Sequence, residues 1–159
     1  AMLPPMGNQL FVYDYADSLP VLKHVVELTH RFRPKNAPLI GANPPEFSDY
    51  PGFSDLRMLG DYILVGFHTK IPSDIMVQLR AKSEQYHLLP ETKTAQEQYV
   101  KPYYLLVKDG EQIGVLDEFP VHGSLNFTDE NGNLYVNDNI SPLVERDYNV
   151  FYKLRLKLD

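Results

Sequence analysis

The chain has 159 residues, enough for one ordinary domain with a sizeable hydrophobic core. Hydrophobic residues make up 43% of it and charged residues 23%, which is typical of a soluble globular protein and excludes a disordered one. The formal net charge of −6 argues against nucleic acid as a partner, and the absence of cysteine excludes disulfides, thiolate metal sites and a cysteine nucleophile. We also expect no membrane span, because no apolar run reaches the roughly 18 residues that one needs.

One short segment departs from the acidic balance of the chain. Residues 30–35 read His-Arg-Phe-Arg-Pro-Lys and are the best local candidate for a basic patch. An exposed loop explains the segment equally well, so we still expect no nucleic-acid partner.

The first fifty residues predict a strand pair followed by a long connection. Residues 9–15 predict a strand and residues 17–20 a turn. Residues 21–29 are ambiguous between strand and helix, and paired valines with a nearby proline favour a strand. The stretch from Pro34 to Pro51 is rich in proline and predicts a surface connection without regular structure.

The middle of the chain predicts a second strand pair and one helix. Residues 53–59 and 61–68 read as strands around Gly60. A helix is predicted from Ile71 to about Tyr86, because apolar residues recur there every fourth position after a proline and an acidic residue. The polar stretch from Lys93 to Gln98 predicts one more helical turn.

The last third of the chain predicts hairpins. Asp109-Gly110 separates two apolar runs, 103–107 and 113–116, and is the favoured sequence of a tight hairpin turn. Residues 122–128 and 133–138 predict a second hairpin. The final strand is predicted from strict alternation of leucines with cations, at Lys153, Leu154, Arg155, Leu156, Lys157 and Leu158. The fold class is therefore mainly antiparallel β with one helical insertion.

A glycine followed by a strand-like run occurs three times. The glycines are Gly7, Gly60 and Gly132, and the first and third copies both read Gly-Asn, then leucine, an aromatic residue, valine, any residue and aspartate. Their spacing predicts a single domain, 1–159, built from approximate repeats at 7–52, 53–120 and 121–159. A four-stranded propeller blade takes roughly 40–50 residues, so insertions explain the longer intervals.

The repeats resemble those of a known family. The segment 129–136, Asp-Glu-Asn-Gly-Asn-Leu-Tyr-Val, looks like an inner-strand turn of six-bladed β-propellers. The order of a helix after Ile71-Pro72, the hairpin Tyr103–Gly110 and a last strand rich in Phe, Tyr and Leu is similar to the TolB-like six-bladed β-propeller family of bacterial exported proteins of unknown function. The resemblance implies an exported protein, at the periplasm or cell surface, and offers no catalytic residue.

The chain is too short for the whole ring that this family forms. The resemblance implies that the chain is similar to the C-terminal half, a partial propeller of about three four-stranded blades, of which the first would lack its innermost strand and the last its outermost. Open blade faces would expose apolar surface and strand edges. We therefore expect either a piece of a longer propeller or a short form that pairs with a second copy. A β-sandwich or meander that is not a propeller stays an alternative.

Candidate site residues follow from the propeller interpretation. The five histidines are scattered without a zinc-binding spacing, but His122 lies near the start of a predicted innermost strand, beside the channel mouth where propellers bind ligands. Tyr135 and Asp138 are the other candidate ligand-binding residues. Asp129, Asn131 and Asn133 mimic a calcium loop, but Leu134 stands where that loop requires glycine, so a hairpin turn is predicted.

We therefore predict a non-enzymatic binding module whose ligand is a protein segment or a glycan. It has no predicted catalytic residue, metal or cofactor. Two alternatives remain open at this stage. One is a carbohydrate-active hydrolase or lyase on a propeller scaffold, and the other is a structural half-ring that associates with itself through its open blade faces.

Overall fold

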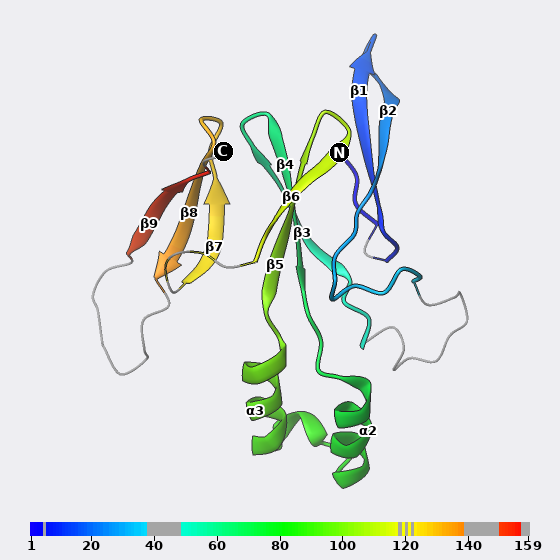
Figure 1. Ribbon diagram of the computed structural model, residues 1–159, viewed down its shortest axis with the longest axis vertical. Helices are drawn as coiled ribbons and strands as arrows, with labels where there is room; N and C mark the ends of the chain where they lie inside the picture. The colour runs from blue at the N-terminus through cyan, green and yellow to red at the C-terminus, as the bar shows by residue number, and fades with distance from the viewer. Residues whose placement is uncertain are drawn as a thin grey trace.

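The fold is mainly β, with three antiparallel sheets set side by side (Figure 1). The computed structural model describes residues 1–4, 6–37, 49–117, 119, 121, 123–138 and 150–156. The first sheet contains β1 (Gln9–Ala16) and β2 (Leu19–Glu27). The central sheet contains, in chain order, β3 (Phe53–Leu59), β4 (Tyr62–His68), β5 (Pro102–Lys108) and β6 (Glu111–Leu116). The third sheet contains β7 (Gly123–Thr128), β8 (Asn133–Asp138) and β9 (Phe151–Arg155).

A helical insertion connects β4 to β5 and lies at one end of the central sheet (Figure 1). It consists of α2 (Ser73–Lys82), the 3-10 helix η1 (Tyr86–Leu88) and α3 (Pro90–Tyr99). The insertion has its own small core, formed by Ile71, Met76, Leu79 and Ala95. It therefore folds against itself and leaves the faces of the central sheet to the other two sheets.

The helical prediction was wrong in its bounds. A helix expected to reach Tyr86 ends at Lys82, because Ser83 takes an extended conformation, and the single turn expected at 93–98 is part of a ten-residue helix. The buried positions of α3 are Thr92 and Ala95, one polar and one small. Such residues give little hydrophobic periodicity, so the sequence pattern underestimated this helix.

The strand predictions are confirmed with small shifts. The ambiguous residues 21–29 belong to β2, which begins at Leu19, inside the expected turn. Asp17 and Ser18 alone make that turn, both at positive φ. The final strand holds Leu154 against the neighbouring core as expected, and Leu158 lies outside the described residues. The three repeated glycines, Gly7, Gly60 and Gly132, all have positive φ, which explains why glycine recurs before each strand.

The central sheet is buried on both faces. One face packs on β1–β2 through a core that includes Ile63, Val65, Phe67, Leu105 and Val107. The opposite face packs on β7–β9 through Leu59, Leu64, Tyr104 and Leu106. This explains why β4 and β5 are continuously apolar instead of alternating. Burying each such aliphatic side chain contributes about 1.5–3 kcal/mol, so these two strands are the main source of stability.

Corresponding edges of neighbouring sheets are joined. At one edge, the Thr128 hydroxyl in β7 donates to the Met58 carbonyl in β3 at 2.5 Å, and Arg57 donates to the Asn126 carbonyl. At the other edge, the side-chain amide of Gln112 in β6 bonds the backbone of Thr29 just after β2. The first strands of two sheets thus meet each other, and so do the last strands.

Candidate functional site

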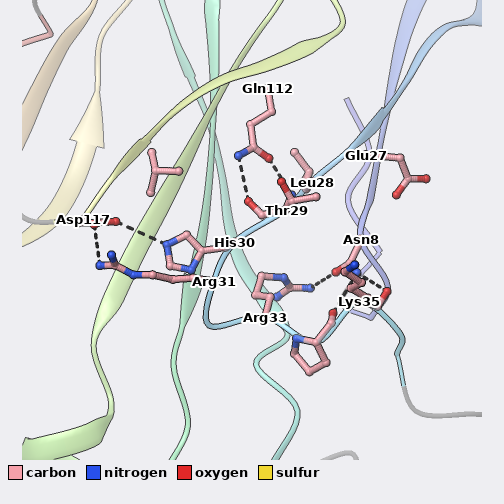
Figure 2. A pocket seen from close by; sticks show the side chains of 12 residues that line it. Asn8, Glu27, Leu28, Thr29, His30, Arg31, Arg33, Lys35, Gln112 and Asp117 are labelled. Atoms are coloured by element: carbon pink, nitrogen blue, oxygen red, sulfur yellow. Dashed lines mark hydrogen bonds and ion pairs between the residues drawn. The ribbon is translucent and has the colours of Figure 1, made fainter.

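A groove of about 880 Å³ lies between the chain that follows β2 and strand β6 (Figure 2). Residues 28–31 and 33–35 form one wall, and Gln112, Val115 and Asp117 form the other. The two walls are held at a fixed spacing by Gln112, whose side-chain amide accepts from the Thr29 N–H at 2.8 Å and donates to the Thr29 carbonyl at 3.0 Å. This pair reproduces the hydrogen bonding of a β-ladder between two separate sheets.

His30 forms the floor of the groove and is held as a neutral imidazole. Its Nδ1 accepts from the Phe32 N–H at 3.2 Å, so the neutral ring carries its proton on Nε2, which faces the Asp117 carboxylate at 3.5 Å. The ring packs against Phe67 and Tyr103, with centroids 5.0 and 4.8 Å away. Burial lowers the pKa of His30, and the nearby Asp117 only partly opposes this effect.

Asp117 also binds the arginine that follows His30. The Arg31 guanidinium lies 3.0 Å from its carboxylate, at an exposed position (Figure 2). Asp117 therefore accepts from two neighbouring side chains of the same wall. An exposed ion pair of this kind contributes about 0–1 kcal/mol, so its main effect is to orient Arg31 along the groove.

Arg33 is a buried cation in the same groove, with 6% of its surface exposed. Its Nη2 donates to the Gly7 carbonyl at 2.8 Å, to Asn8 Oδ1 at 3.1 Å and to the Tyr50 hydroxyl at 3.2 Å, and its Nη1 donates to the Pro51 carbonyl. All of these acceptors are formally neutral. Arg33 thus ties the segment before β1 to the segment before β3.

The surroundings of Arg33 are aromatic and contain no carboxylate partner within the described part of the chain. Its guanidinium stacks over the Phe53 ring at 3.6 Å from the centroid. No hydrogen bond or ion pair among the described residues joins it to Asp or Glu, and its Nε has no hydrogen-bond partner there. Burial lowers the pKa of Arg33, because no described carboxylate compensates for the loss of water around the charge.

The predicted ligand-binding residues do not come together. Tyr135 and Asp138 both lie in β8, but they are three residues apart and so point to opposite faces of the sheet. The Tyr135 hydroxyl donates to Asp129 at 3.1 Å, and Asp138 accepts from the Tyr152 hydroxyl at 3.4 Å. His122 lies outside the described residues.

Asp129 organises the hairpin turn that the sequence predicted in place of a calcium loop. Its carboxylate accepts from the N–H groups of Asn131 and Asn133 at 3.0 and 2.9 Å, and from the Asn133 side chain. These hydrogen bonds lower the pKa of Asp129. The carboxylate oxygens thus serve the turn itself. In the described ranges of the chain, no three His, Asp or Glu side chains are grouped as metal ligands would be.

Tyr135 belongs to an exposed aromatic cluster. It stacks on Phe127 with ring centroids 4.3 Å apart, and Phe151 lies 6.1 Å from Phe127 on the same face. Phe127 and Phe151 are each 43% exposed. We call these three residues the outer face of β7–β9, because they point away from the central sheet.

Comparisons with known proteins give no relative for this chain. No family model matches it, and no curated protein or solved structure matches it significantly. Of the helices that the structure describes, none is both long enough and apolar enough to cross a bilayer. The function must therefore be inferred from the faces and the groove themselves.

The groove cannot be predicted from the sequence, although one segment that lines it stands out by its charge. Residues 30–35 stand out as the most basic segment, and all of them except Phe32 line one wall. The opposite wall, with Gln112 and Asp117, comes from more than 75 residues later in the chain. No spacing within the sequence could connect the two walls, because their contact depends on how the first two sheets pack.

Proposed function

We propose that this protein is a non-enzymatic interaction module, a partial β-propeller whose two terminal sheets bind protein surface, and that its partner is a second copy of the chain. One observation carries the proposal. Among the described residues, the central sheet is covered on both faces, whereas each terminal sheet is covered on one face and exposes apolar side chains on the other.

The first uncovered face belongs to β1–β2. Register places Phe11 opposite Val25 and Tyr13 opposite Leu22, so these four side chains share the side that faces away from the central core. Leu22 and Val25 are exposed, and Tyr15, further along the same side, is 75% exposed. We call these five residues the outer face of β1–β2. A contiguous apolar surface of this kind is typical of an interface.

The second uncovered face is the outer face of β7–β9. Phe127 stacks on Tyr135, the Phe151 ring is tilted by 60° to Phe127, and Lys153 approaches Tyr135 at 5.8 Å from the ring centroid. Aromatic residues are enriched in the cores of protein interfaces. A glycan is less well supported as the ligand, because three of the five side chains on the outer face of β1–β2, Phe11, Leu22 and Val25, offer no hydrogen-bonding group.

The arrangement of the sheets supports the propeller interpretation. The first strands of the central and third sheets meet, and the last strands of the first and central sheets meet, as in consecutive blades that are stacked in register. On this interpretation the first sheet lacks two inner strands among the described residues, where the sequence predicted that only the innermost is missing, and the third sheet lacks its outer strand there.

A second copy is the partner that continues the same packing. Within the chain, the central sheet packs one face on β1–β2 and its opposite face on β7–β9. Continuing that order from β7–β9 leads to the outer face of β1–β2 of another copy. In a two-fold dimer this contact forms twice, and both uncovered faces are buried.

Light scattering after gel filtration tests the proposal. We expect the chain at about 100 µM to have twice its monomer mass, because association through both outer faces removes their exposed apolar side chains from water. The double variant Phe127→Ser/Phe151→Ser removes two exposed rings and should shift the protein to monomer.

The matched control changes two exposed apolar residues outside both faces. Val77 and Leu88 in the helical insertion are 64% and 70% exposed, so Val77→Ser/Leu88→Ser should leave the mass unchanged. Circular dichroism of each variant checks that it is folded. A monomeric parent protein over the whole concentration range would contradict the proposal, as would equal effects of the two double variants.

A further inference from the structure

The groove carries an excess of positive charge in an acidic protein. Three cationic side chains, Arg31, Arg33 and Lys35, line it against two carboxylates, Glu27 and Asp117. Asp117 forms an ion pair with Arg31 and faces His30. His30 is neutral near pH 7, because burial lowers the pKa of its imidazole. Glu27 accepts from the Gln9 amide at 2.5 Å. Within the described ranges, neither Arg33 nor Lys35 forms an ion pair.

Arg33 and Lys35 lie toward one end of this groove. Asn8 joins them, because its side chain accepts from Arg33 and donates to the Lys35 carbonyl at 2.7 Å (Figure 2). Arg31 with Asp117 lies toward the other end. The end around Arg33 therefore holds the two cations that no described carboxylate neutralises.

A buried guanidinium without an anion is unfavourable. Taking a charge out of water costs several kcal/mol unless a counter-charge and hydrogen bonds compensate for it. The neutral acceptors around Arg33 supply hydrogen bonds but no negative charge, and Nε remains without a partner among the described residues. An anion in the groove would supply the missing charge.

The lining selects the kind of anion. Leu28, Pro34 and Val115 give the groove an apolar part next to its cations. Glu27 and Asp117 would repel a dianion such as phosphate more strongly than a monoanion. A volume of about 880 Å³ also exceeds what a single inorganic ion fills and is of the size that organic ligands occupy.

We propose that this groove binds a carboxylate attached to an apolar stem. The carboxylate lies at the Arg33 and Lys35 end, and the stem lies against Leu28 and Val115. A small organic acid and the C-terminal carboxylate of a peptide share this chemistry. The proposal concerns a site on another part of the molecule than the two outer faces, so it stands or falls independently of self-association.

Titration of the labelled full chain with hexanoate, followed by NMR, tests the site. We expect saturable shifts of the amides of residues 28–35, with a Kd on the order of 0.1–1 mM for so small a ligand. Hexanamide, which has the same stem without the charge, should give no saturable shift. Lys35→Gln removes one exposed cation of the groove and should weaken hexanoate binding about fivefold. Lys93→Gln, which removes an exposed cation of α3, should leave binding unchanged.

Further arms of the titration separate the possible sources of the carboxylate. An N-acetylated, uncharged peptide with a free C-terminal carboxylate should bind, and its C-terminal amide should not. Binding of this peptide that is tighter than that of hexanoate would identify a chain end as the ligand, and equal or weaker binding would identify a small acid. Absence of saturable hexanoate shifts would overturn the proposal, as would tighter binding of inorganic phosphate or an affinity insensitive to Lys35→Gln.

Discussion

His30 combines burial with a fixed hydrogen-bonding role. Its side chain is 4% exposed, its Nδ1 accepts a backbone hydrogen bond, and aromatic rings surround it. Protonation would place a proton on Nδ1, where the Phe32 N–H already donates. The folded protein therefore prefers the neutral ring, which agrees with a pKa lowered by burial.

This preference predicts a pH-dependent stability. The unfolded chain binds a proton at His30 near pH 6.5, whereas the folded chain binds it only at lower pH, so the free energy of unfolding falls as the pH drops below about 6.5. Urea unfolding at about pH 7.5 and about pH 5.5 measures the fall. His30→Gln should show a smaller fall in the free energy of unfolding between these pH values. Part of the fall should persist in this variant, because burial also lowers the pKa of His68. An equal fall in the variant and the parent would show that His30 titrates normally.

The contribution of single residues was hard to predict from the sequence. The acidic balance drew attention to residues 30–35, but nothing there distinguishes the buried Arg33 from the exposed Arg31. Both flank Phe32 and both read as surface charges. Their difference arises because Arg33 meets segments before β1 and before β3, which only the tertiary fold brings together. The interpretation as a plain exposed loop was therefore incomplete.

Two glycines in the central sheet show how packing constrains an element. Gly66 in β4 lies between Asp55 of β3 and Tyr104 of β5, and an added Cβ would stand 2.9 Å from the Asp55 Cβ and 3.0 Å from the Tyr104 ring. Gly114 in β6 has no atom within 4 Å of the same position. Neither residue has a positive φ, so the two positions differ in the space available for a side chain and not in backbone conformation.

The pair predicts opposite effects of one substitution. Gly66→Ala should lower the free energy of unfolding by about 1–3 kcal/mol, because the Tyr104 ring must move away from the methyl group. Gly114→Ala should raise it by about 0.5–1 kcal/mol, because alanine loses less backbone entropy in a strand. Urea unfolding of both variants measures the two values. A destabilised Gly114→Ala together with an unchanged Gly66→Ala would contradict the packing described for the central sheet.

Elements were predicted best where the pattern is local. The turn at Asp109-Gly110 was confirmed because both residues take positive φ in a tight turn, a requirement visible in two letters of sequence. The apolar pattern alone does not assign β4 and β5, since a continuous apolar run fits a buried helix as well as a strand covered on both faces. Their short length and the turn residues beside them are also needed. Helix α3 was underestimated because its buried side is formed by Thr92 and Ala95. Which sheets pack on which faces could not be deduced, because that depends on contacts between distant residues.

At the scale of the whole molecule, the three sheets pack face to face, and the described residues leave the outer face of each terminal sheet uncovered. The outer faces of β1–β2 and β7–β9 differ in chemistry, because the first mixes aliphatic with aromatic side chains and the second is formed by three aromatic rings. Each chain also carries a net charge of −6, so two copies repel each other. Added salt would screen that repulsion and favour association through the apolar faces.

Two arrangements of a dimer are possible and can be separated by mixing variants. In the head-to-tail arrangement, the outer face of β1–β2 contacts the outer face of β7–β9 of the other copy, twice. In the alternative arrangement, like faces contact each other. We expect the head-to-tail arrangement, because it repeats the order in which successive sheets of one chain pack.

The test uses one variant blocked at each face. Leu22→Asp/Val25→Asp places charges on the outer face of β1–β2, and Phe127→Asp/Phe151→Asp places them on the outer face of β7–β9. In the head-to-tail arrangement each variant alone is monomeric, since every contact would include a blocked face. A mixture of the two forms a 1:1 complex through the one contact that joins both intact faces, which light scattering and native mass spectrometry detect.

In the like-face arrangement each variant alone still dimerises through its intact face. Dimers of either single-face variant would therefore show that the stack closes by like-face contacts, which the continuous order of packing within the chain does not predict.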